Sequence, residues 1–86
     1  MLTISFKASF AREFNKLEKN LRDEVLSKMN LFKNPLNHEM LKVHKLHGRM
    51  KNMWSFSVNY KTRIVFNYES KKEVAFLAIG NHRVYN

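Results

Sequence analysis

Three reactive side chains stand close together at the carboxyl-terminal end of the sequence. His82, Arg83 and Tyr85 follow an apolar run that is predicted to be a β-strand ending near Gly80. An imidazole can donate or accept a proton near neutral pH, and a guanidinium matches the planar geometry of a phosphate. The types and spacing of these residues therefore suit acid–base chemistry on a ligand that contains phosphate.

A second group of reactive side chains lies in the middle of the chain. Imidazoles and cations are interspersed there, as Lys42, His44, Lys45, His47, Arg49 and Lys51. Arg63 opens a later strand at the parity opposite to its apolar residues, so we expect it to face away from the helices. If these strands are neighbours, Arg63, the central cluster and His82 line one concave surface.

Such a surface has the groups that RNA cleavage needs. The 2′-hydroxyl of the RNA attacks the adjacent phosphorus, a base takes its proton, and an acid protonates the leaving 5′-oxygen. Arg63 can stabilise the extra negative charge, and a histidine can serve in either proton transfer. We expect the basic residues Lys42, Lys45, His47, Arg49, Lys51 and Arg83 to bind RNA. The plain alternatives stay open: Arg63 as a solvated strand residue, His82 as an idle imidazole, and Tyr85 as a ring packed on the sheet edge.

Other chemistries lack their residues. The sequence has no cysteine, and no carboxylate lies between Glu39 and Glu69 to join the central histidines, so we expect no metal site and no cofactor. It contains no GxSxG, no phosphate-binding glycine-rich loop and no dinucleotide fingerprint. The acidic residues of the helical segments are expected on a solvated face; they are Glu13, Glu18, Asp23 and Glu24.

The overall charge limits the class of partner. Sixteen Lys and Arg against seven Asp and Glu give a formal net charge of +9 on 86 residues. A surplus this large attracts polyanions such as RNA, DNA, an anionic membrane or an acidic protein. No apolar run approaches the roughly 20 residues of a membrane span. The amino-terminal segment also lacks the apolar block of a signal peptide, so we expect a cytoplasmic protein.

Hydrophobic periodicity predicts the elements that position these residues. Residues 2–7 alternate as a half-buried strand, and two helical stripes follow, with Ser9 and Asn20 as N-caps and Pro35 after the second. Further segments predict strands over residues 41–46, 53–60, 63–68 and 74–79. Tyr60 falls on the inner face. We therefore expect one α+β domain over residues 1–86: an N-terminal strand and an antiparallel helical hairpin packed on one face of a mainly antiparallel sheet of four or five strands.

Four segments, in this order, resemble the RelE/ParE superfamily of toxins from bacterial type II toxin–antitoxin systems. They are His44-Lys45-Leu46-His47-Gly48, Trp54-Ser55 with Phe56 and Val58, Tyr60-Lys61-Thr62-Arg63-Ile64-Val65-Phe66, and Ile79-Gly80-Asn81-His82 with Tyr85. The match covers nearly the whole chain and implies the RelE-like fold.

The resemblance implies an endoribonuclease that cuts translated messenger RNA on the ribosome without a metal. Carried over residue by residue, Arg63 matches the arginine that stabilises the phosphate, and His82 matches a histidine that acts as acid or base. Tyr85 matches the terminal aromatic that stacks on or activates the scissile nucleotide. His44 matches a histidine of the YafQ-like branch. Lys42 and Lys45 stand where RelE-like members carry catalytic or RNA-binding lysines.

The resemblance also implies partners: a cognate acidic antitoxin, the ribosome with its message, and operator DNA contacted only through the antitoxin. No membrane partner is expected. Two alternatives stay open. ParE-like relatives inhibit DNA gyrase without nuclease activity, and a chain whose toxicity has decayed would be a basic RNA- or protein-binding module. An ending without a histidine–aromatic pair would favour the ParE-like alternative, and this chain has that pair.

Overall fold

The structure is a computed structural model that describes residues 1–81 and Val84, and of Arg49 only the backbone. Within these residues the elements are β1 (Thr3–Phe6), α1 (Ala8–Asn15), α2 (Lys19–Phe32), β2 (His44–Lys45), β3 (Trp54–Ser57), β4 (Arg63–Tyr68) and β5 (Glu73–Gly80). Two short 3-10 helices, η1 (Pro35–Asn37) and η2 (Gly48–Met50), lie on either side of β2.

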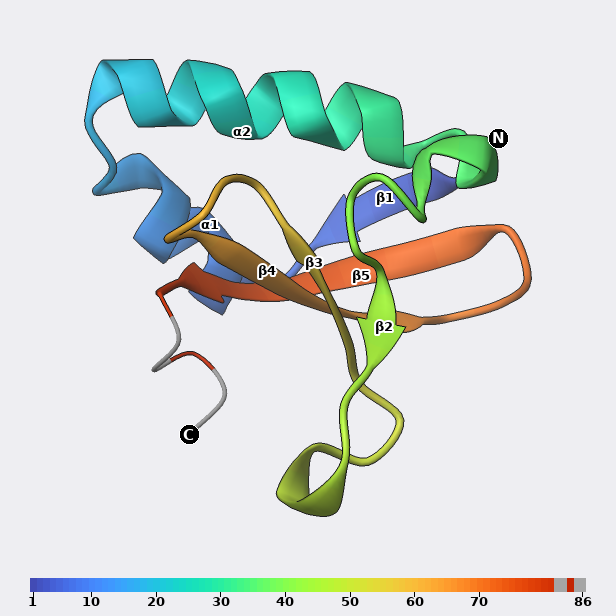
Figure 1. Ribbon diagram of the computed structural model, residues 1–86. Coiled ribbons are helices and arrows are strands. Elements are labelled where there is room, and N and C mark those ends of the chain that lie inside the picture. Colours follow the sequence, from blue (N-terminus) through green and yellow to red (C-terminus); the bar gives the residue numbers. More distant parts are fainter. Residues whose placement is uncertain (82–83, 85–86) are drawn as a thin grey trace.

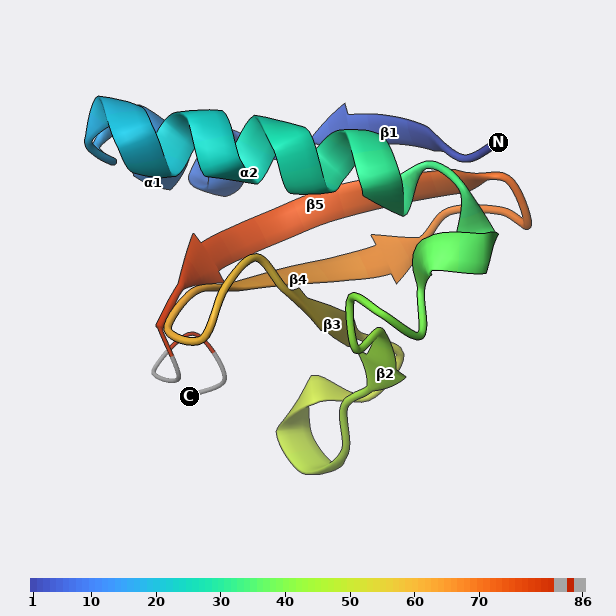
Figure 2. The same cartoon turned by 45° about the horizontal axis from the view of Figure 1, so that its top comes forward.

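The elements form two layers, a sheet and the helices that cover it (Figure 1). The strand order is β1-β5-β4-β3-β2; β1 runs parallel to β5, and the other neighbours pair antiparallel. Figure 2 shows both α-helices on one side of the sheet, while the excursion that carries η2 extends away from them. The predicted α+β class, with the helices on one face of a mainly antiparallel sheet, is confirmed.

Phenylalanine rings fill the space between the two layers. Phe32 of α2 has no exposed surface, and its ring centroid lies 4.6 Å from that of Phe56, 4.9 Å from Phe66 and 5.4 Å from Phe76. These three partners lie on β3, β4 and β5, and each is also fully buried. Burying one such side chain stabilises a fold by about 1.5–3 kcal/mol. The cluster therefore fixes α2 on the sheet and sets the register of the three central strands.

Both helices begin before the residues predicted to cap them. Lys7 and Glu18 hold the N-cap positions, and neither makes a side-chain capping hydrogen bond. The Ser9 hydroxyl instead donates to the Leu77 carbonyl at 2.6 Å and so ties α1 to β5. Leu77 lies where the register between β4 and β5 shifts, which frees its carbonyl for this bond. The predicted caps at Ser9 and Asn20 are therefore wrong.

The strands are shorter than the segments that alternate. β2 keeps only two residues, because Lys42 has a φ of 60° before it and Gly48 has a φ of 73° after it, and both leave the extended region. β3 ends at Ser57, where the chain turns toward β4. Tyr60 lies in that turn and is 89% exposed, so the inward position that alternation gives it is wrong.

Candidate functional site

Arg63 is the first residue of β4 and lies on the parity opposite to the core. Ile64 and Phe66 are fully buried, whereas Arg63 is half-buried, as the alternation predicts. Its Nη1 donates to the carbonyl of Asn59 at 2.6 Å and to that of Thr62 at 3.3 Å. No carboxylate among the described residues pairs with it. The guanidinium is therefore held in place by backbone carbonyls while its positive charge has no counter-ion in this part of the chain.

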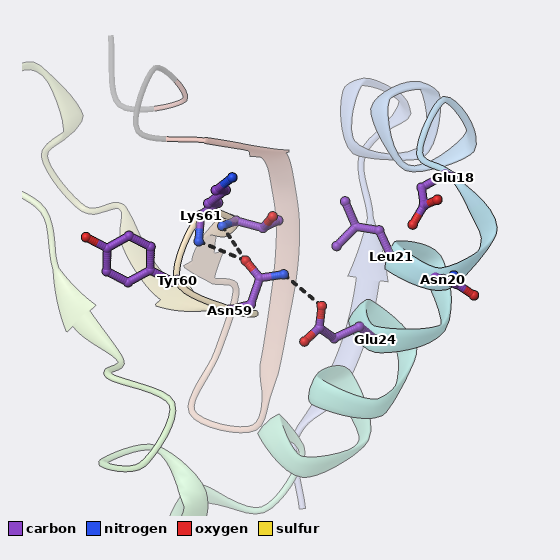
Figure 3. Close-up of a pocket in the computed structure, with 8 residues that line it drawn as sticks. Glu18, Asn20, Leu21, Glu24, Asn59, Tyr60 and Lys61 are labelled. Carbon is purple, nitrogen blue, oxygen red and sulfur yellow. Dashed lines mark hydrogen bonds between the residues drawn. The ribbon is translucent and has the colours of Figure 1, made fainter.

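The turn between β3 and β4 holds Arg63 through Asn59. Oδ1 of Asn59 accepts hydrogen bonds from the backbone N–H groups of Lys61 and Thr62, at 2.9 and 2.8 Å. Its Nδ2 donates to Oε1 of Glu24 on α2 at 2.7 Å, and Figure 3 shows this bond between the turn and the helix. One side chain thus fixes the shape of the turn, fastens it to α2 and sets the carbonyl that holds Arg63.

His44 rises from the same face of the sheet as Arg63. The register pairs His44 with Ser55 and Arg63 with Ser57, and these two serines lie two residues apart on β3, so they share a face. With about 4.8 Å between strands and 3.3 Å per residue, the Cα atoms of His44 and Arg63 are about 12 Å apart. The two groups flank the serines without touching each other.

The tautomer of His44 follows from its hydrogen bond. Nδ1 lies 2.8 Å from the carbonyl oxygen of Lys42. Because a carbonyl only accepts, Nδ1 carries the hydrogen and donates it. The neutral ring then keeps Nε2 as an acceptor, and the side chain is exposed. His44 therefore presents a nitrogen that can take a proton from a ligand on this face.

The other basic residues predicted to bind RNA lie on β2 and in the turns around it. Lys42, His47 and Lys51 are exposed in the flanking turns. Lys45 is also exposed, but it follows His44 directly in β2 and so points to the other face. The side chain of Arg49 lies outside the described residues. This cluster therefore surrounds the edge of the sheet rather than one face of it.

The tail carries the remaining predicted site residues. His82, Arg83 and Tyr85 lie outside the described residues, and their roles stay predictions. The strand that leads to them is described: β5 ends at Gly80, which is the register partner of Arg63. The described part of the chain therefore brings the start of the tail beside Arg63.

His38 and Tyr68 have positions that separate them from this site. The His38 ring stacks on Phe32 with 4.6 Å between centroids, and its Nε2 lies 2.8 Å from the Phe32 carbonyl at the end of α2. This contact caps the helix. Burial raises the pKa of the Tyr68 phenol, and Tyr68 closes β4 at the end opposite to Arg63.

Two further features concern ligands and membranes. Among the described residues, no three His, Asp or Glu side chains gather as metal ligands. In the same part of the chain, no helix has the length and apolar character that crossing a membrane requires.

Solved structures with the same fold include toxin–antitoxin complexes. YafQ from E. coli superposes with a TM-score of 0.74 at 15% identity, over 98% of this chain and 97% of that one. The YoeB–YefM complex from Staphylococcus aureus gives 0.73 at 15%, over 95% and 98%. A conserved hypothetical protein from Helicobacter pylori gives 0.72 at 21%, over 96% and 97%. No family model and no curated protein matches the sequence. The predicted resemblance to RelE-like toxins is thus confirmed at the level of the fold.

Sequence reasoning missed the residues that support Arg63. Glu24 was expected on a solvated face, but it is half-buried and accepts the hydrogen bond from Asn59. Asn59 lies inside the segment predicted as a strand over residues 53–60, so its role in the turn was not predicted, although an asparagine often shapes a turn. Its link to α2 spans 35 positions in the chain, and no local pattern indicates such a contact.

Proposed function

We propose that this chain is the toxin of a type II toxin–antitoxin pair and that it cuts translated messenger RNA. One observation carries the proposal: on the face of the sheet that also presents His44, Arg63 is fixed and has no carboxylate partner among the described residues. The fold shared with YafQ and with the toxin of the YoeB–YefM complex supports the same function. The net charge of +9 favours a polyanionic substrate.

The proposed reaction is an attack of the RNA on itself. A base takes the proton of the 2′-hydroxyl, the 2′-oxygen forms a bond to the adjacent phosphorus, and the bond from phosphorus to the 5′-oxygen breaks. An acid gives a proton to that 5′-oxygen, so the products are a 2′,3′-cyclic phosphate and a 5′-hydroxyl. Arg63 stabilises the negative charge on the phosphate. His44 and His82 are assigned to the two proton transfers, and Tyr85 to the scissile nucleotide.

The proposed partner is an acidic antitoxin protein. Two structures with this fold were solved as toxin–antitoxin complexes, YoeB–YefM from S. aureus and RelBE2 from Mycobacterium tuberculosis. An acidic chain complements the charge of +9 and would speed association at low salt. Operator DNA is assigned to the antitoxin rather than to this chain, and the ribosome supplies the translated message.

Induced expression in growing bacteria tests the function. We expect growth to stop and new 5′ ends to appear inside the coding regions of translated messages, while the same message without its start codon stays intact. Lys71→Gln, in the turn between β4 and β5, serves as a control that removes one charge far from the site. If growth stops while messages stay intact and DNA breaks accumulate at gyrase, the chain is a gyrase inhibitor and the nuclease proposal is wrong. If nothing happens, the toxin proposal fails as well.

A further inference from the structure

A hollow of about 400 Å³ lies beside Arg63, between α2, the turn before β2 and the turn after β3. Lys28 of α2 and Lys42 line it together with Arg63, and no acidic side chain of the described residues does. Its volume falls in the range of small-ligand sites. Three cations around an open space favour an anion of the size of a nucleotide.

Lys28 is the cation that α2 contributes to the hollow. It is half-buried on α2, one helical turn after Glu24. A glutamate and a lysine at this spacing often pair, but the Glu24 carboxylate accepts the hydrogen bond from Asn59, and no carboxylate of the described residues lies within 4.0 Å of the Lys28 ammonium. A cation that is partly removed from water without a counter-ion gains from an anion placed beside it.

The rim of the hollow offers an aromatic ring. Tyr60 lines the hollow and is 89% exposed, which is unusual for a residue of its size. Figure 3 shows its ring directed away from Glu24 and α2. An exposed ring beside cations is the arrangement that binds single-stranded nucleic acid, because a base stacks on the ring while the cations hold the phosphate.

We propose that this hollow binds the nucleotide next to the one that is cut. Lys28 and Lys42 contact its phosphate and Tyr60 stacks on its base, so the RNA runs from Arg63 past the carboxyl-terminal end of β3 toward α2. The inference rests on the proposed nuclease function, because Arg63 is taken to hold the scissile phosphate. An acidic peptide could use the same cations but gains little from the exposed ring, and we therefore assign the site to single-stranded RNA.

Binding of an RNA that cannot react tests the hollow separately from cleavage. The probe is a fluorescent six-nucleotide 2′-O-methyl RNA, whose affinity for the purified chain is measured by anisotropy over a range of salt. We expect Lys28→Gln to weaken binding about three- to tenfold and to reduce the salt slope by about 0.7, the loss of one phosphate contact. Lys71→Gln removes the same charge at the opposite end of β4 and should leave both values unchanged. Equal effects of the two variants would overturn the proposal.

Substitutions of Tyr60 test the same site without changing the charge of the chain. Tyr60→Phe keeps the ring and should bind like the unchanged chain, whereas Tyr60→Ala should lose about tenfold. If the alanine variant binds normally, or if Lys28→Gln weakens an acidic peptide but not the RNA, the assignment to RNA is wrong. If the chain binds the probe through Lys28 but cuts no message, the proposed RNA site stands and the proposed nuclease function is wrong. If Lys28→Gln cuts messages and binds the probe as the unchanged chain does, only the proposed RNA site in the hollow is wrong.

Discussion

Arg63 combines a fixed position with a charge that has no counter-ion among the described residues. Backbone carbonyls of Asn59 and Thr62 hold its Nη1, so its position is set, yet no carboxylate in the described chain offsets its charge. A carboxylate partner would hold the side chain equally well and would weaken its attraction for a phosphate. Holding a cation with neutral acceptors prepares it for an anion that arrives later.

Arg63→Lys should separate position from charge. A lysine keeps the charge but cannot donate to both carbonyls and to a phosphate with a planar group. We expect cleavage of a translated message to fall about 100-fold, as for the loss of one transition-state donor. The free energy of unfolding should change by less than about 1 kcal/mol, since the side chain lies outside the core. A variant that cuts at the original rate would show that Arg63 acts only through its charge.

The roles of the two ring nitrogens of His44 can be separated in the same way. Asparagine places an N–H where Nδ1 stands, so His44→Asn keeps a donor for the Lys42 carbonyl and removes the free Nε2. We expect His44→Asn to cut as poorly as His44→Ala in a single-turnover assay, with a fall of about 100-fold if Nε2 transfers a proton. Full activity of the asparagine variant would reduce His44 to a structural donor.

At the scale of elements, the turn between β3 and β4 is the part that links α2 with the site. Asn59 closes the turn on itself and reaches Glu24, while its backbone holds Arg63. Loops usually lie on the surface and are more mobile than the helices and strands that they connect. Here a hydrogen bond of 2.7 Å joins the turn between β3 and β4 to α2. Arg63 therefore follows a turn that is held both by its own hydrogen bonds and by the helix.

The anchor predicts an ordered series of stabilities. Asn59→Ala removes three hydrogen bonds and leaves backbone N–H groups without acceptors, so we expect a loss of about 1–3 kcal/mol in urea unfolding. Glu24→Gln keeps an acceptor for Nδ2 and should lose less than about 1 kcal/mol. Glu13→Gln, which only disturbs an exposed pair with Lys16, should change little. If Asn59→Ala is as stable in urea unfolding as Glu13→Gln, the hydrogen bonds of Asn59 do not stabilise the fold.

At the scale of the whole molecule, one aromatic cluster joins the two layers, and the chain carries a net charge of +9. An 86-residue chain buries a modest share of its surface, so its stability depends on few contacts. Phe32 contacts the rings of three strands and the ring of His38, which caps its own helix. The position of Arg63 follows from the register that this cluster sets, and the pairing of β2 with β3 places His44 on the same face.

Phe32→Ala should therefore remove most of the stability. A phenylalanine truncated in a core costs about 3–5 kcal/mol, which approaches the whole stability of a small domain. We expect the variant to unfold at a much lower urea concentration or to fail to fold. Leu36→Ala, at a side chain that is 88% exposed, provides the matched control and should unfold like the unchanged chain. Similar midpoints for the two variants would contradict the central role of the cluster.

The sequence predicts the layers well because alternation and helical periodicity report burial directly. Phe56, Phe66 and Phe32 fall on the inner faces that the patterns assign, and Arg63 falls on the outer one. The patterns fail where the chain leaves regular geometry. The left-handed φ of Lys42 shortens β2, and the turn after Ser57 exposes Tyr60, and neither has a periodic signature.

The supporting residues of the site are hidden from sequence for a different reason. Glu24 and Asn59 meet across 35 positions, and Lys28 lines the hollow only because α2 crosses the end of β3. Such contacts depend on how elements dock, which local propensity does not encode. The outward position of Arg63 was predictable because strand parity suffices to find it, while the roles of Arg63 and His44 stay predictions.

The chemistry of the cut ends tests the central claim most directly. A translated message is incubated with the purified chain and ribosomes, and the ends of its fragments are identified. The account predicts a 5′-hydroxyl on the downstream fragment and a 2′,3′-cyclic phosphate on the upstream one, with both products reduced about 100-fold by Arg63→Lys. Intact messages, or fragments with 5′-phosphate ends, would contradict it, because attack by the RNA's own 2′-hydroxyl cannot leave a phosphate on the 5′-oxygen.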